Sequence, residues 1–122
     1  MARCNLKDDA GSYLSYGVHP HGFHGMSHSK ASNFHGCRTL ILNHNNLSND
    51  TAKSFGEALS KPNLGLKHLD VSHNLINDAG VELIMESLAY NNSLITLNLC
   101  ENLLKNASGR AMVEAMKSNK TL

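Results

Sequence analysis

Hydrophobic positions recur along most of this chain at a nearly constant interval. Leu40, Leu42, Asn45 and Leu47 begin the pattern. They return as Leu69, Val71, Asn74 and Ile76, and then as Leu97, Leu99, Asn102 and Leu104. Self-similarity at a fixed interval of this size indicates a repeat protein, in which each unit buries its apolar side against the next.

The first part of each unit predicts a short strand. Leu69 and Val71 alternate with Asp70 and Ser72, and this period of two places one pair inside and the other outside. The asparagine that follows lies where the chain must turn, and its amide can pair with backbone groups that the turn leaves free. We therefore expect the three asparagines of the repeat to form a ladder inside the bend.

The second part of each unit predicts a helix. Within residues 79–88, Leu83, Ile84 and Leu88 form one apolar face opposite Glu82 and Glu86. The apolar face recurs in the neighbouring units as Phe55 and Leu59, and as Met112 and Met116. Strands alternating with helices predict an α/β solenoid, with short parallel strands on its concave side and helices on its convex side.

The full motif resembles the ribonuclease-inhibitor class of leucine-rich repeats, and it consists of Leu66, Leu69, Val71, Asn74, Ile76, Gly80, Leu83 and Leu88. The resemblance covers residues 37–122. It implies an intracellular, protein-binding horseshoe without intrinsic catalysis. Such repeats occur in ribonuclease inhibitors, nucleotide-binding immune receptors, tropomodulin-like actin regulators and axonemal regulatory subunits, so the resemblance leaves the partner open.

A fourth copy of the repeat begins the chain, because residues 5–14 align without a gap on residues 74–83. The sequence between it and the first full unit is longer than the period allows and is rich in Gly, Ser and His. We therefore expect a partial repeat at 1–17, an insertion loop at 18–36, and full repeats at 37–65, 66–93 and 94–122.

The insertion loop contains five of the eight histidines, among them His19, His21 and His24. Imidazoles at this spacing can bind Zn²⁺ or Ni²⁺. However, no carboxylate or cysteine stands at ligand spacing beside them, and glycines and a proline favour an irregular loop. We expect no metal site and no cofactor, and a metal-binding regulator is the alternative interpretation.

Composition narrows the class of partner. The 122 residues carry 11 basic and 10 acidic side chains with no Lys/Arg run, so we expect neither a nucleic acid nor a membrane as partner. The N-terminus has no apolar segment typical of a signal peptide, and no apolar run reaches the roughly 18 residues of a membrane helix. We expect a cytoplasmic protein, with a cytoskeletal or ciliary assembly as its setting.

No motif of an enzyme is present, whether a nucleophile elbow, a phosphate loop or a metalloprotease helix, so we expect no catalysis. The outward positions of the strands are the candidate binding site, because the core does not need them. The candidate residues are Asn43, His44, His68, Asp70, Ser72, His73, Asn98, Cys100 and Glu101. Of these, Asp70, His73 and Glu101 are the first to test.

The predicted function is a protein–protein interaction module or structural subunit, which binds through its concave strand face or through uncapped solenoid ends. Met112, Val113 and Met116 should leave apolar surface on the last helix, and Leu122 occupies the opening position of another unit. We therefore expect a fragment or short variant of a longer repeat protein, or a member of a larger cytoskeletal or axonemal assembly. A fragment of a nucleotide-binding immune receptor is a further alternative.

Overall fold

The computed structural model describes residues 38–60 and 65–122. This part of the chain alternates strands with helices: β1 (Thr39–Ile41), α2 (Asn49–Leu59), β2 (His68–Asp70), α3 (Asp78–Leu88), β3 (Thr96–Asn98) and α4 (Asn106–Ser118). The predicted alternation is therefore confirmed here. The partial repeat at 1–17 and the His-rich insertion at 18–36 lie outside the described residues.

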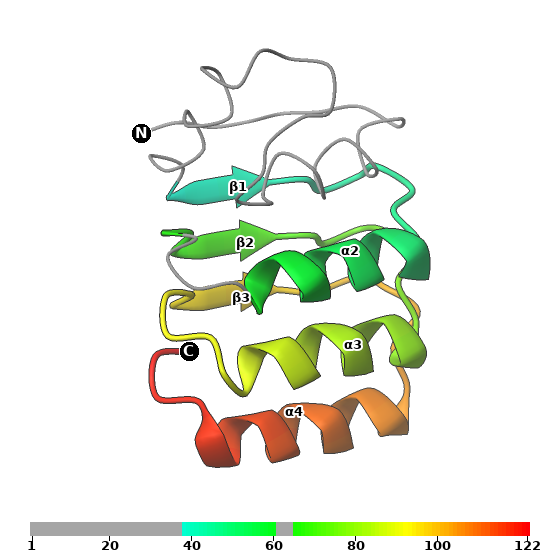
Figure 1. Ribbon diagram of the computed structural model, residues 1–122. Helices are drawn as coiled ribbons and strands as arrows, with labels where there is room; N and C mark the ends of the chain where they lie inside the picture. Colours follow the sequence, from blue (N-terminus) through cyan, green and yellow to red (C-terminus); the bar gives the residue numbers. More distant parts are fainter. Residues whose placement is uncertain (1–37, 61–64) are drawn as a thin grey trace.

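The strands form one parallel sheet in the order β1-β2-β3. Leu40 pairs with Leu69, which pairs with Leu97, so the register is the one that the sequence alignment predicts. Figure 1 shows the strands in one layer and the helices in a second layer, with all three described helices running in the same direction. The core lies between these two layers.

The core is filled by the residues that the alternation predicts to point inward. Leu40, Leu69, Val71, Ile84 and Leu88 are all at most 1% exposed. The packing loosens toward α4, where Leu97 and Met112 are only half-buried. Val113 is 64% exposed and Met116 is 39% exposed, which confirms the expected apolar surface on the last helix.

The asparagine ladder is confirmed for Asn74 and Asn102. The side-chain oxygen of Asn74 accepts hydrogen bonds from the backbone N–H of Asn45 at 3.0 Å and of Leu47 at 2.9 Å, and its amide nitrogen donates to the Leu42 carbonyl at 3.0 Å. Asn102 makes equivalent bonds to the backbone of the preceding unit. Each asparagine thus completes polar groups that the turns would otherwise leave unpaired.

A second ladder follows the helices. Asn91 donates to the Leu59 carbonyl at 2.9 Å and accepts from the Leu94 N–H at 2.8 Å, while Asn119 donates to the Leu88 carbonyl at 2.6 Å. We did not predict this ladder, although Asn91 and Asn119 occupy equivalent positions of successive units and could have revealed it.

Two glycines set the distance between α2 and α3. A Cβ atom on Gly56 would lie 2.7 Å from the Leu83 carbonyl oxygen of α3, and one on Gly80 would press on the Asn49 side chain and lie 3.1 Å from Cβ of Ala52, both in α2. Neither position has room for a side chain without a shift of its neighbours. In α4, Gly109 faces open space, and Ser108 occupies the position equivalent to Gly80, with its buried hydroxyl donating to the Asp78 carboxylate.

Candidate functional site

The parallel register brings the predicted site residues onto one face of the sheet. Asp70 pairs with Asn98, and His68 lies shortly before Asp70 on the same strand. The stretches that follow the strands continue side by side, since the His44 N–H donates to the Ser72 carbonyl at 3.2 Å. The exposed members of the site are His44, His68, His73, Asn98, Cys100 and Glu101, and the half-buried ones are Asn43 and Asp70.

Ser72 differs from the expectation, because it is only 4% exposed. Its hydroxyl donates to Oδ1 of Asp70 at 2.6 Å, and its backbone N–H donates to the same oxygen at 2.9 Å. That Ser72 contacts a partner therefore stays a prediction, and its hydroxyl is already used within the face. It holds the Asp70 carboxylate in position, because the turn after β2 folds its side chain back onto the strand.

Asp70 is the best-defined charge of this face. Its partial burial raises the pKa, but the hydrogen bonds from the Ser72 hydroxyl and backbone, together with Asn98 and the nearby His73, outweigh burial. The pKa of Asp70 therefore lies below its ordinary value. The face keeps this negative charge throughout the neutral pH range.

The imidazoles of His44 and His73 stack on one another. Their ring centroids are 4.1 Å apart and the planes are 13° from parallel. Beside them, Nδ1 of His68 lies 2.8 Å from the Thr96 hydroxyl oxygen. These contacts hold three side chains of the face in defined orientations before any partner arrives.

The backbone after each strand adopts an unusual conformation. The φ angles of His44, His73 and Glu101 are 56°, 52° and 54°, in the left-handed region that residues other than glycine rarely enter. Each such residue costs about 1–2 kcal/mol relative to the right-handed region. The same angle at equivalent positions in three successive units shows that the turn imposes it, so the backbone carrying these residues is fixed.

Cys100, the cysteine of this face, is exposed, and its backbone donates to Oδ1 of Asn98 at 3.1 Å and accepts from the His73 N–H at 2.9 Å. In residues 38–60 and 65–122, no three His, Cys, Asp or Glu side chains are grouped closely enough to hold a metal ion together. Within the same residues, no helix is long and apolar enough to cross a membrane.

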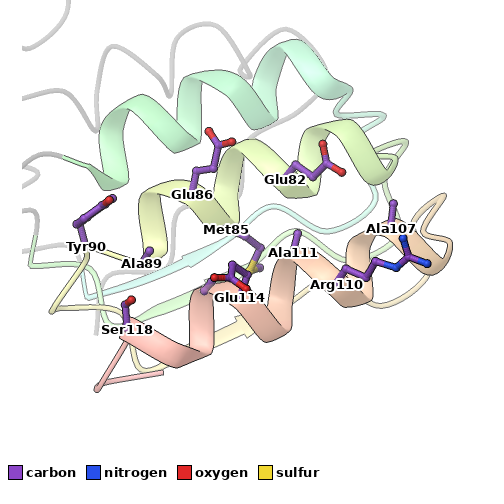
Figure 2. A pocket seen from close by; sticks show the side chains of 11 residues that line it. Glu82, Met85, Glu86, Ala89, Tyr90, Ala107, Arg110, Ala111, Glu114 and Ser118 are labelled. Carbon is purple, nitrogen blue, oxygen red and sulfur yellow. The ribbon is translucent and has the colours of Figure 1, made fainter.

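A groove of about 790 Å³ between α3 and α4 was not predicted from the sequence. Figure 2 shows Tyr90 and Ser118 at one end of it and Ala107 and Arg110 at the other. The sequence signal that could have revealed it is the replacement of Gly56 by a larger residue at the equivalent position of the next unit, which is Met85.

Comparison with known proteins supports the fold. No protein-family model matches the sequence, and no curated protein matches it either. Among the solved structures that resemble this chain is the leiomodin-1 actin-binding site 2 (ABS2), with a TM-score of 0.66 and 16% sequence identity over 93% of this chain and 74% of that chain. This likeness supports a leucine-rich-repeat-like fold with parallel strands and helices.

Proposed function

We propose that this chain is a non-catalytic protein-interaction module, a short curved solenoid of leucine-rich repeats of the ribonuclease-inhibitor class. Its partner binds on the strand face that carries Asp70, His73 and Glu101. The larger setting that we propose is a cytoskeletal assembly, and a ciliary location stays a prediction from the sequence resemblance alone.

The observation that carries this proposal is the fixed polar face. The Asp70 carboxylate is held by two hydrogen bonds from Ser72, and the imidazole of His73 is stacked on His44. None of these side chains fills the core, so the fold does not need their chemistry. Polar groups that are already oriented lose little entropy when a partner binds, which favours a docking surface.

Actin is the first partner to test, because the similar leiomodin-1 structure is described as an actin-binding site. Cosedimentation of the chain with actin filaments, and fluorescence titration with actin monomers, would measure binding directly. Saturable binding to either form would assign the partner. Absence of binding to both would remove actin and leave the proposed module with another protein partner.

The face itself is tested with the triple variant Asp70→Asn, His73→Asn and Glu101→Asn. Asparagine tolerates the left-handed backbone, so the fold should survive the two changes at positive φ. The matched control replaces Lys53 and Glu57 on the exposed side of α2 with glutamine. We expect the triple variant to lose at least tenfold in partner binding (about 1.4 kcal/mol), and the control to lose none.

Partners for this comparison are proteins that co-purify from native cells and are quantified by mass spectrometry. Proteins lost with the triple variant and retained with the control support the strand face as the binding site. If both variants retain every partner while circular dichroism shows an intact fold, the strand face is not the docking surface.

A further inference from the structure

We propose that the groove between α3 and α4 binds an amphipathic helical segment of a protein partner, with an arginine or lysine of that segment at the Tyr90 end. This site is separate from the strand face, since it lies in the helix layer (Figure 1). It therefore goes beyond the proposed function and would give the module a second interaction surface.

The groove exists because one helix contact lacks the glycine that closes the other. Gly56 lets α2 touch the backbone of α3 at Leu83, and the equivalent residue one unit later is Met85. Met85 is buried and lines the groove together with Ala111 and Ala115 of α4. Two alanines and a flexible thioether offer an apolar floor that a helical partner can approach closely.

The two ends of the groove differ in charge. Toward the Tyr90 end, Glu86 of α3 and Glu114 of α4 line opposite sides of the groove (Figure 2), and both helices end on this side. The carbonyl ends of two parallel helices add partial negative charge. At the other end, Glu82 of α3 and Arg110 of α4 both line the groove, so charges of both signs lie there.

The charges at the Tyr90 end are not explained by the stability of the helices themselves. Glu86 lies in the last turn of α3, where a negative charge is unfavourable, and that turn contains no basic residue. Glu114 is paired with Lys117 at 2.5 Å, but both side chains are largely exposed and such a pair is weak and exchangeable. A cation from a partner would offset the charge of both carboxylates.

Tyr90 adds an aromatic surface at the same end. It is 85% exposed, so its ring is free to cover the side chain of an incoming residue. A guanidinium or ammonium group over such a ring gains a cation–π interaction in addition to the carboxylates. Carboxylates, helix ends and an exposed ring thus all favour a cationic group at this one end.

The length of the groove fixes the length of the partner segment. It follows α4 from Ala107 to Ser118, a stretch of roughly 16 Å at the helical rise of about 1.5 Å per residue. A partner helix of about three turns would fill it. Its apolar stripe would contact Met85 and the alanines, and its basic residue would lie at the Tyr90 end.

The test uses the whole chain and fluorescein-labelled helical peptides of about three turns, each with a leucine and alanine stripe. One peptide carries two arginines in its first turn and another carries them in its last turn, so either direction of binding is covered. A third peptide has glutamate in place of both arginines. Fluorescence polarisation should show at least one arginine peptide binding about fivefold or more tightly than the glutamate peptide.

Three variants then locate the bound peptide. The double variant Glu86→Gln and Glu114→Gln should weaken the arginine peptide by roughly fivefold to tenfold. Ala111→Phe, which fills the floor, should remove binding. The matched control is Glu57→Gln, because Glu57 is the equivalent of both glutamates in the first full unit but does not line the groove. This control should bind like the unchanged chain.

Several outcomes would overturn the proposal. The first two are binding of the glutamate peptide as tight as that of the arginine peptides, and a loss of affinity in Glu57→Gln as large as in the double glutamate variant. The others are unchanged peptide binding by Ala111→Phe with an intact circular dichroism spectrum, and no detectable binding of any peptide. Binding of Ca²⁺ but not of the peptides would replace the helical partner with a cation. Self-association in sedimentation experiments that Ala111→Phe abolishes, without peptide binding, would replace the partner with a second copy of this chain.

Discussion

The contact between α2 and α3 is closed, whereas the contact between α3 and α4 is open, although both join equivalent parts of the repeat. At the first contact, Gly56 and Gly80 leave no room for a side chain. At the second, Met85 and Ser108 stand at the equivalent positions, and a groove of about 790 Å³ runs between the helices. The shared pattern therefore determines how the units stack, and the residues at which the units differ determine where the helix layer opens.

The core-facing residues of α3 and α4 also differ, in how deeply they are buried. Ile84 and Leu88 of α3 are fully buried, while their equivalents on α4 are Met112, which is half-buried, and Met116, which is exposed. Equivalent positions of the repeat are thus buried in α3 and partly or largely exposed in α4. Substitutions at matched positions can measure this difference.

The largest difference is expected between Leu88→Ala and Met116→Ala. Leu88 is 0% exposed, so its truncation should leave a cavity and cost about 2–5 kcal/mol in the free energy of unfolding. Met116 is already in contact with water, and its truncation should cost less than about 1 kcal/mol. Urea unfolding of both variants measures the two values. Equal losses would mean that Met116 in α4 is as closely packed as Leu88 in α3.

A smaller difference of opposite sign is expected between Gly56→Ala and Gly109→Ala. Alanine gains up to about 1 kcal/mol over glycine in a helix, but at position 56 it would press on the Leu83 carbonyl oxygen and cost roughly 1–3 kcal/mol through overpacking. At position 109 no atom beyond the adjoining residues and the local helix backbone lies within 4 Å of the new methyl group, so only the gain remains. Thermal unfolding should show a lower midpoint for Gly56→Ala and a higher midpoint for Gly109→Ala. Stabilisation by both would contradict the closed contact.

The smallest expected effect is on the stability of the fold at acidic pH. The Asp78 carboxylate accepts from the Ser108 hydroxyl and from the Lys105 backbone N–H at 2.6 Å, and these bonds hold its pKa below the ordinary value of 3.8. A carboxyl whose pKa is lower in the folded chain stabilises the fold above its unfolded pKa, and this contribution is lost as the pH falls through the folded pKa. In Asp78→Asn, the unfolding free energy should therefore decrease less than in the unchanged chain as the pH falls below about 4.

The control for the acid experiment is Asp50→Asn at the start of α2, whose carboxylate has no hydrogen-bond partner within residues 38–60 and 65–122. Its urea unfolding between neutral pH and the acid limit should follow the unchanged chain. A control that flattens the curve as much as Asp78→Asn would show that the link between α3 and α4 through Ser108 contributes little.

The alternation of strands and helices, their register and the inward residues could all be predicted from the sequence. The reason is physical, since Leu40, Leu69 and Leu97 must share one side of a parallel sheet for any of them to be buried. The asparagine ladder was predictable for a similar reason, because a tight turn leaves backbone groups that an amide can pair with. The division of residues 1–37 and the boundaries of the repeats stay predictions.

The details of the site could not be predicted, because they depend on backbone angles and not on residue type. Nothing in a histidine or a glutamate signals the left-handed conformation of His44, His73 and Glu101. Ser72 occupies an outward position by alternation, yet the turn after β2 buries its hydroxyl against Asp70. The groove depends on the distance between helices. Met85 stands at the position that Gly56 occupies in the unit before, but this difference indicates a groove only once the helices are placed.

The two asparagine ladders have a consequence for how the chain unfolds. The Asn74 side chain forms hydrogen bonds with the backbone of Leu42 and Leu47, and the Asn91 side chain donates to the Leu59 carbonyl. Each unit thus supplies hydrogen-bond partners to backbone groups of the unit before it. Detaching a later unit exposes unpaired groups in an earlier one, at about 1–3 kcal/mol for each group left buried. Neighbouring units should therefore melt together as one cooperative block, with amide hydrogen exchange in β2 no faster than in β1.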